Sequence, residues 1–372
     1  MLLSILILAA ATLAIFFSAV LVGKKKTTSA DRVLSIWLLI VFTQLIIYLI
    51  EVHQIKYANI WVEISGALVF LLGPILLLYY KLLSQTTYKK RENFVHFFPF
   101  AINLLLIPLL VTAENYFLDI TLLVLKIASL LSYNLIILSK LSQHHKKIKW
   151  FYSNIENKEL QWLKVVVIGL LLTTSIAIVS TFLSEFEIIQ IPLDGEFLIP
   201  IAASILVFYM GYSGIRQTSI FVDFEDTNEK NLISKKYNNT GLDKKQSAEK
   251  FQAIRITILE RKLFLEPQLK LSDLAKEMDI PTHHLSQMIN QNAGQNFYQF
   301  INTFRIDEVI KNIHLDKHKK NTLFAIALDA GFNSKASFNR AFKNIVEMTP
   351  TEYITKYEDD KQNTVLNPKF SS

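Results

Sequence analysis

Two stretches in the last third of the chain decide its fold: LSDLAKEMD at residues 271–279 and LFAIALDAG at residues 323–331. In both, apolar residues stand four positions and one position before a small alanine, Ala275 or Ala327. One stripe of the helix can therefore face inward, while the alanine lets a second helix cross it closely. The repeat predicts two helix-turn-helix modules within one helical domain.

The helix that follows the first stretch is expected to begin at Thr282. Leu285, Met288 and Ile289 recur at helical spacing and are expected to face the core. The other face then carries polar side chains that can hydrogen-bond base edges or phosphates in a DNA major groove: His283, Ser286, Gln287 and Asn290. We interpret this helix as the first DNA-reading helix.

The second module turns at Gly331, where a glycine allows a backbone conformation that a side chain opposes. Ser334 is expected to cap the next helix, in which Phe338 and Phe342 point inward. The opposite face carries the expected DNA contacts of this second reading helix: Lys335, Ser337, Asn339, Arg340 and Lys343. We expect Arg340 to be the main base reader, because a guanidinium can form two hydrogen bonds with guanine.

An apolar-striped helix at residues 297–309 is expected to hold the two modules at a fixed separation. The run Thr349-Pro350-Thr351-Glu352 has the pattern of a capping box and predicts a short final helix. The helical domain is therefore expected to contain both modules, a connecting helix and a terminal helix.

The tandem resembles the AraC/XylS family of transcription regulators. The residues that carry the resemblance are Leu271-x-x-Leu274-Ala275, Leu285-Ser286, Phe297-Tyr298-x-x-Ile301-Asn302-x-x-Arg305, Ile326-Ala327, Gly331-Phe332-x-Ser334, Phe338-x-x-x-Phe342-Lys343 and Thr349-Pro350-x-x-Tyr353. The resemblance implies double-stranded promoter DNA as partner and two recognition helices in successive major grooves. Two departures lie in the first module, where Asp279 replaces the usual Gly and Pro281 the usual capping Ser.

The first 216 residues are dominated by apolar runs of membrane-spanning length. A hydrocarbon core about 30 Å thick needs roughly 20 helical residues. Six runs carry no charge: 2–22, 33–50, 64–80, 93–113, 165–184 and 197–215. A seventh, 116–139, contains Lys126. We therefore predict an all-α protein, with a seven-helix transmembrane bundle followed by the soluble helical domain, and this order resembles membrane-bound members of the same family.

Basic loops predict the orientation of these helices. Residues 24–32 and 81–91 hold four Lys and Arg each, and residues 140–164 hold six, whereas the intervening loops hold only Lys56. By the positive-inside rule the basic loops are cytoplasmic. Lys24 to Lys26 follow the first apolar run instead of preceding it, which indicates an uncleaved helix with its N-terminus outside rather than a signal peptide. Seven crossings then leave the C-terminal domain in the cytoplasm, at the inner membrane of a bacterium.

Lys126 is the charged residue inside a predicted span, and a charge there costs about 2.5 to 3.5 kcal/mol on insertion scales. One interpretation is a sensing cavity in which Lys126 faces Gln44, Glu63 or Asp119. The alternative is a lysine that reaches toward the membrane surface or pairs for structural reasons. The sequence leaves both open.

Several classes of function lack support in the sequence. The chain has no Cys, and it contains no Gly-rich phosphate loop and no dinucleotide motif. His314 and His318 are spaced as metal ligands but stand beside lysines of an exposed connector. We therefore expect no enzyme activity, no cofactor and no metal. Net charge does not reveal DNA binding, because residues 249–359 hold 15 Lys and Arg against 14 Asp and Glu.

Together these patterns predict four regions: a transmembrane sensor at 1–216, a cytoplasmic linker at 217–246, a DNA-binding domain at 247–360 and a disordered tail at 361–372. The expected function is membrane-bound transcription regulation, in which an unknown signal ligand met in the bilayer changes promoter binding. A homodimer and a contact with RNA polymerase are compatible with this function. The alternatives are a transporter with a regulatory domain and a sensor whose helical domain binds protein.

Overall fold

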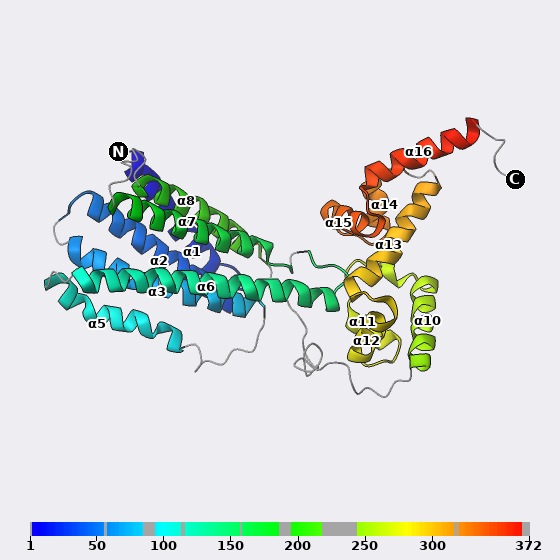
Figure 1. Cartoon of the computed structure of the whole chain (residues 1–372), viewed down its shortest axis with the longest axis horizontal. Coiled ribbons are helices and arrows are strands. Elements are labelled where there is room, and N and C mark those ends of the chain that lie inside the picture. The colour runs from blue at the N-terminus through cyan, green and yellow to red at the C-terminus, as the bar shows by residue number, and fades with distance from the viewer. Residues whose placement is uncertain are drawn as a thin grey trace. The chain divides into compact units, whose positions relative to one another are not determined.

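The computed structural model describes residues 2–55, 58–84, 94–112, 116–156, 158–185, 195–217, 244–315, 318 and 320–366. Throughout these residues the regular secondary structure is helical, as expected for an all-α protein. The chain forms two compact units (Figure 1). The first contains the helices up to α8, except for residues 145–159. Those residues belong to the second unit, together with the helices from α10 onward.

The first unit contains all seven predicted apolar helices. They are α1 (Leu2–Val22), α2 (Ser29–Val52), α3 (Ala58–Leu83), α5 (Phe98–Thr112, preceded by the 3-10 turn Val95–Phe97), α6 (Tyr116–Phe151), α7 (Gln161–Glu185) and α8 (Gly195–Arg216). Six of them, counting α5 with its preceding turn, are long and apolar enough to cross a membrane; the apolar part of α8 described in full, Ile201–Arg216, is shorter.

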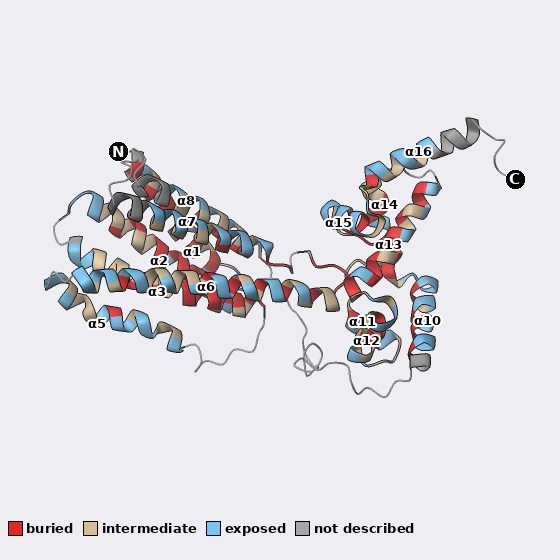
Figure 2. Ribbon diagram, viewed as in Figure 1, coloured by how far each residue is buried: buried red, intermediate tan, exposed pale blue. Residues whose placement is uncertain are grey.

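The surface of this unit is rich in large apolar side chains. Leu105, Phe117 and Ile205 are more than half exposed, and Figure 2 shows exposed residues along the outer faces of these helices. Such a surface would be costly in water and is favourable in hydrocarbon. The composition and the packing of the first unit therefore both fit a lipid environment.

Hydrogen bonds join helix ends that are expected on one side of the membrane. Lys24, after α1, donates through Nζ to the carbonyl oxygen of Gly214 in α8 at 3.1 Å. At the start of α7, Trp162 Nε1 donates to Gln217 Oε1 at 2.8 Å. The end of α1, the start of α7 and the end of α8 therefore lie together, which agrees with an odd number of crossings.

The second unit is built from short helices around two apolar clusters. Its helices are α10 (Lys244–Glu260), α11 (Leu271–Glu277), α12 (Thr282–Ala293), α13 (Phe297–His314), α14 (Leu323–Asp329), α15 (Lys335–Val346) and α16 (Pro350–Leu366), with a 3-10 turn at Leu263–Leu265. Figure 1 shows α13 running from the α11–α12 pair to the α14–α15 pair. Its first half, including Phe300, packs in the first cluster, and its second half, including Val309, packs in the second. This is the connecting role that the sequence predicts for residues 297–309.

The two modules repeat the same turn in atomic detail. The backbone N–H of Ile280 donates to the carbonyl of Ala275 at 2.9 Å, and Phe332 N–H donates to the carbonyl of Ala327 at 3.0 Å. The residue before each donor has a left-handed backbone, with φ +50° at Asp279 and +93° at Gly331. Asp279 therefore takes the conformation that glycine would supply, so its departure from the family pattern leaves this turn in place.

Two predicted boundaries meet the structure only in part. Most of the expected linker at 217–246 lies outside the described residues, and α10 begins within it at Lys244. The expected disordered tail begins at residue 361, but α16 continues to Leu366. The final segment, 367–372, lies outside the described residues.

Candidate nucleic-acid interface

Helix α15 presents the cationic face that the sequence predicts for the second reader. Ser334 caps the helix by accepting a hydrogen bond from the backbone N–H of Ser337 at 3.2 Å. Phe338 and Phe342 are buried in the second apolar cluster. The exposed side chains of the helix include the four longest of the predicted contacts, Lys335, Asn339, Arg340 and Lys343, while Ser337 is half-buried.

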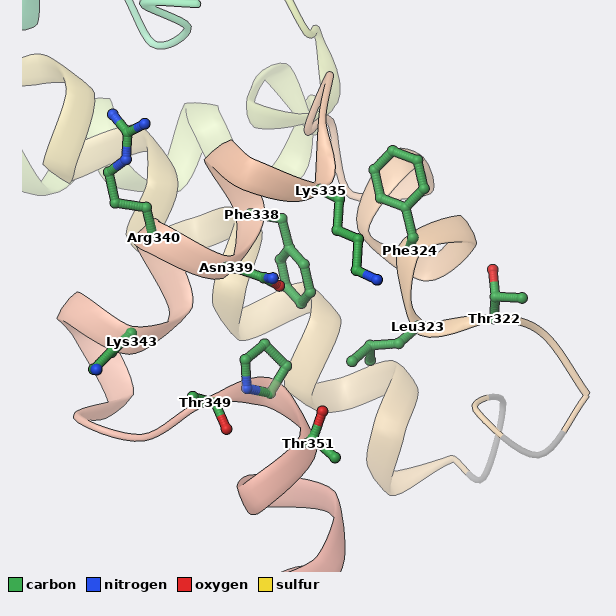
Figure 3. Close-up of a pocket in the computed structure, with 11 residues that line it drawn as sticks. Thr322, Leu323, Phe324, Lys335, Phe338, Asn339, Arg340, Lys343, Thr349 and Thr351 are labelled. Atoms are coloured by element: carbon green, nitrogen blue, oxygen red, sulfur yellow. The ribbon is translucent and has the colours of Figure 1, made fainter.

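These side chains border a surface pocket of about 650 Å³. Its other walls come from the start of α14 and the start of α16 (Figure 3). In that view Lys335 and Asn339 extend into the pocket, whereas the Arg340 guanidinium points away from its centre. Two lysines, one amide and one guanidinium on a single open face provide the donors that phosphates and base edges accept.

Threonines at the pocket rim are additional candidates that helical spacing missed. Thr322 caps α14 and accepts from the N–H of Ala325 at 3.1 Å, and Thr349 caps α16 through its capping box with Glu352. Thr351 lines the same pocket. Capping residues at helix starts often contact phosphates. The capping positions of Thr322 and Thr349 in the sequence could therefore have identified these two threonines as candidate phosphate contacts.

Helix α12, the expected first reading helix, matches its prediction less completely. His283 is exposed, and Ser286 and Asn290 are half-buried on the same side of the helix. Gln287, expected on this face, is only 5% exposed, so this expectation is corrected. Helical spacing predicts which face of a helix packs on the apolar core. It does not predict whether other parts of the protein bury residues on the opposite face. Pro281 precedes the helix without a side-chain cap, as its departure from the family pattern suggests.

Arg340 already holds an acidic partner within the second unit. Its Nη1 donates to Glu159 Oε1 at 2.8 Å. The side chain of Glu159 is 8% exposed, and that of Arg340 is 49% exposed. The expected base reader is therefore engaged by a carboxylate from the segment between α6 and α7, a contact for which the sequence offers no signal.

Arg305, which contributes to the family resemblance, lies in the core of this unit and is 1% exposed. Its Nε and Nη2 donate to the carbonyls of Phe264 and Glu266, both at 2.7 Å. Nη1 and Nη2 also donate to the carbonyl and hydroxyl oxygens of Ser153 at 3.3 and 3.1 Å. Burial lowers the pKa of Arg305 to about 10, and the charge remains at neutral pH. The residue is therefore a buried structural cation rather than a DNA contact.

The predicted sensing residues lie in the first unit. Lys126 is half-buried on α6, and its ammonium lies where a side chain on Gly66 of α3 would stand. Glu63 and Asp119 are the acidic groups that act on this ammonium. Gln44 is half-buried on α2, and no hydrogen bond among the described residues joins it to Lys126. Of the three predicted partners of Lys126, Glu63 and Asp119 interact with its charge, and Gln44 forms no hydrogen bond with it within the described residues.

Comparison with known proteins agrees with the repeated turn and the exposed face of α15. Residues 274–356 match the family described as a helix-turn-helix domain. The C-terminal unit contains an AraC-type helix-turn-helix domain. This match confirms the helix-turn-helix domain that the tandem pattern predicts.

Proteins similar to part of this chain occur in Staphylococcus aureus. Proteins of strains COL, MSSA476 and N315, each described as an uncharacterized HTH-type transcriptional regulator, are 34% identical over 91 residues. The aligned part is 24% of this chain and 12% of each relative. No solved structure matches the chain. The similarity to these relatives therefore covers about a quarter of this chain.

Proposed function

We propose that this chain is a membrane-embedded, sequence-specific DNA-binding transcription regulator, in which a signal met by the apolar helices changes promoter binding by the C-terminal domain. The observation that carries the proposal is the exposed cationic face of α15 in the second of two helix-turn-helix modules. The apolar helices that precede this domain in the same polypeptide support a location at the inner membrane of a bacterium.

Each polar group of the interface has a distinct role in this proposal. Arg340 reads a base, because its guanidinium can donate twice to guanine O6 and N7. Lys335 and Lys343 neutralise phosphates and set the register of the helix. In the first module, His283, Ser286 and Asn290 supply weaker, adaptable contacts to a second stretch of major groove.

The signal enters this proposal through the first unit. Lys126, near Glu63 and Gly66, is a polar position that a ligand could contact. A ligand that prefers one conformation of the bundle shifts the population of the DNA-binding state by its difference in affinity for the two conformations. The full chain would then act as a one-component receptor, with a homodimer and RNA polymerase as further partners to be tested.

The proposal is tested with the full chain in lipid nanodiscs and a DNA fragment recovered by selection from a genomic library. Arg340→Ala should weaken specific binding by about 1 to 3 kcal/mol and relax sequence preference, if the contact is bidentate. Lys335→Ala should weaken binding to all sequences equally and reduce its salt dependence. Lys311→Ala, an exposed lysine on the connecting helix α13, serves as the matched control and should leave binding unchanged.

The measured quantities are affinity for the selected fragment, affinity for a scrambled fragment and the slope against salt concentration. If Arg340→Ala binds the selected fragment as tightly as the parent, the base reader is misassigned. If the parent prefers no genomic fragment over the scrambled one, the proposed function is wrong.

A further inference from the structure

The segment 145–159 joins the apolar unit to the DNA-binding unit by a second route besides the linker. The segment begins in the last turns of α6, a helix that ends at Phe151. It ends at Glu159, and Leu160 alone separates Glu159 from the start of α7 at Gln161. A helix of 36 residues is about 54 Å long, well beyond a hydrocarbon core of about 30 Å. The end of α6 is therefore available outside the membrane.

The middle of this segment is anchored inside the DNA-binding unit. Ser153 is 1% exposed. Its backbone N–H and its hydroxyl both donate to the carbonyl of Leu269, at 3.2 and 2.8 Å. Its oxygens accept two hydrogen bonds from Arg305, and Tyr152 forms a β-bridge with Lys270. Because a buried guanidinium that loses its acceptors is costly, this anchor is expected to persist whether or not DNA is bound.

The end of the segment contacts the proposed base reader. The Glu159 carboxylate offers the Arg340 guanidinium the same kind of acceptor that guanine or a phosphate would offer. The hydrogen that Arg340 Nη1 donates to Glu159 is not available to DNA while this contact lasts. A carboxylate left beside the reading helix would also repel the phosphate backbone. Nearly half of the Arg340 side chain is exposed, so this contact can break without opening the core.

We propose that Glu159 is an intramolecular competitor of DNA for Arg340, held in place by the Ser153 anchor and released when the start of α7 moves. This inference rests on the proposed function. Leu160, the residue that joins Glu159 to α7, has φ +53°, a conformation that side chains disfavour. A movement of the first turn of α7 is therefore transmitted to Glu159 through Leu160 alone. Meanwhile the hydrogen bonds of Ser153 keep the segment bound to the core of the second unit. The contact is a latch through which the apolar helices could hold the second reader inactive.

The first test compares DNA affinity for variants of the full chain in nanodiscs, using the fragment that the parent selects. Glu159→Gln keeps the size of the side chain and removes the charge that competes with DNA, and it should bind roughly 3- to 10-fold more tightly. Glu156→Gln removes the same charge from an exposed position of the same segment and should bind like the parent. In an Arg340→Ala background, Glu159→Gln should have a clearly smaller effect, because the competition for Arg340 is gone and only the repulsion of phosphates is relieved.

A second measurement uses the unaltered chain, so it does not depend on how a variant folds. Hydrogen–deuterium exchange of the amides around Glu159 should rise when DNA is added, whereas the amide of Ser153 should stay protected. Equal affinities of parent and Glu159→Gln, or exchange at residue 159 that DNA leaves unchanged, overturn the latch alone. Loss of preference for the selected fragment in every variant overturns the proposed function, and the latch with it.

Discussion

At the scale of single residues, the second turn depends on Gly331 more than on any side chain around it. Its φ is +93°, and a Cβ there would lie 2.7 Å from the carbonyl oxygen of Phe264. Gly294 also has a positive φ, +66°, but a Cβ there would meet nothing within 4 Å. The two glycines form a matched pair that separates backbone strain from a steric clash.

We predict that Gly294→Ala destabilises the second unit by about 1 kcal/mol, the usual cost of a left-handed alanine. Gly331→Ala should cost roughly 2 to 4 kcal/mol, because the clash with backbone adds to that strain. Exchange of core amides in α13 to α15 measures the free energy of opening for both variants. Similar losses for the two would show that the backbone near Phe264 yields easily and does not require a glycine.

A second residue-scale prediction concerns Lys126. Lys126→Met removes the charge but keeps a long side chain, so the chain should still insert into the membrane. If Lys126 belongs to the sensing site, a reporter gene under the regulated promoter should lose its response to the inducing signal. A structural lysine would instead leave the response intact and change only the amount of inserted protein. Glu51→Gln, at an exposed position near the end of α2, controls for loss of one surface charge.

The sequence predicted which residues of α15 are buried and which are exposed. Phe338 and Phe342 are buried in the second apolar cluster, and Lys335 and Arg340 are exposed, as the spacing of apolar residues along α15 predicts. Gln287 was misplaced because burial on the side of a helix away from its core depends on long-range packing, which helical spacing does not contain. The same reason explains why the Glu159 partner of Arg340 could not be predicted, since 181 residues separate the two.

At the scale of elements, helix types and the two turns follow from local patterns. The capping residues and the apolar stripes fixed α12, α13, α15 and the start of α16 to within a few residues. The role of residues 145–159 does not follow, because a basic loop between two spans looks like an ordinary cytoplasmic connection. Only the acceptors around Arg305 reveal it as part of the domain core.

We predict that a soluble fragment of residues 244–366 is less stable than the same fragment carrying residues 145–159 through a flexible linker. Without the segment, Arg305 loses two hydrogen bonds to Ser153, and two such bonds to a charged group are worth about 3 to 6 kcal/mol. Urea unfolding followed by circular dichroism measures the difference. A fused segment with Ser153→Ala should recover only part of it, and equal stability of all three fragments would contradict the anchor.

At the scale of the whole molecule, the absence of cysteine permits a direct test of orientation. Single cysteines at Lys25, Ile55 and Lys311 would stand in the loop after α1, in the loop after α2 and in the C-terminal unit. A membrane-impermeant maleimide should label only Ile55→Cys in intact spheroplasts, and all three after permeabilisation. Labelling of Lys311→Cys in intact cells would place the DNA-binding domain on the wrong side for its proposed function.

We propose that this chain, with its apolar helices of membrane-spanning length, uses its helix-turn-helix domain to occupy specific DNA. The most direct measurement is cross-linking of the full chain to DNA in living cells, followed by sequencing of the recovered fragments. Discrete sites should be recovered with the parent chain and lost with Arg340→Ala, while the amount of protein in the membrane fraction stays the same. Recovery of the same even background from both chains would contradict the account.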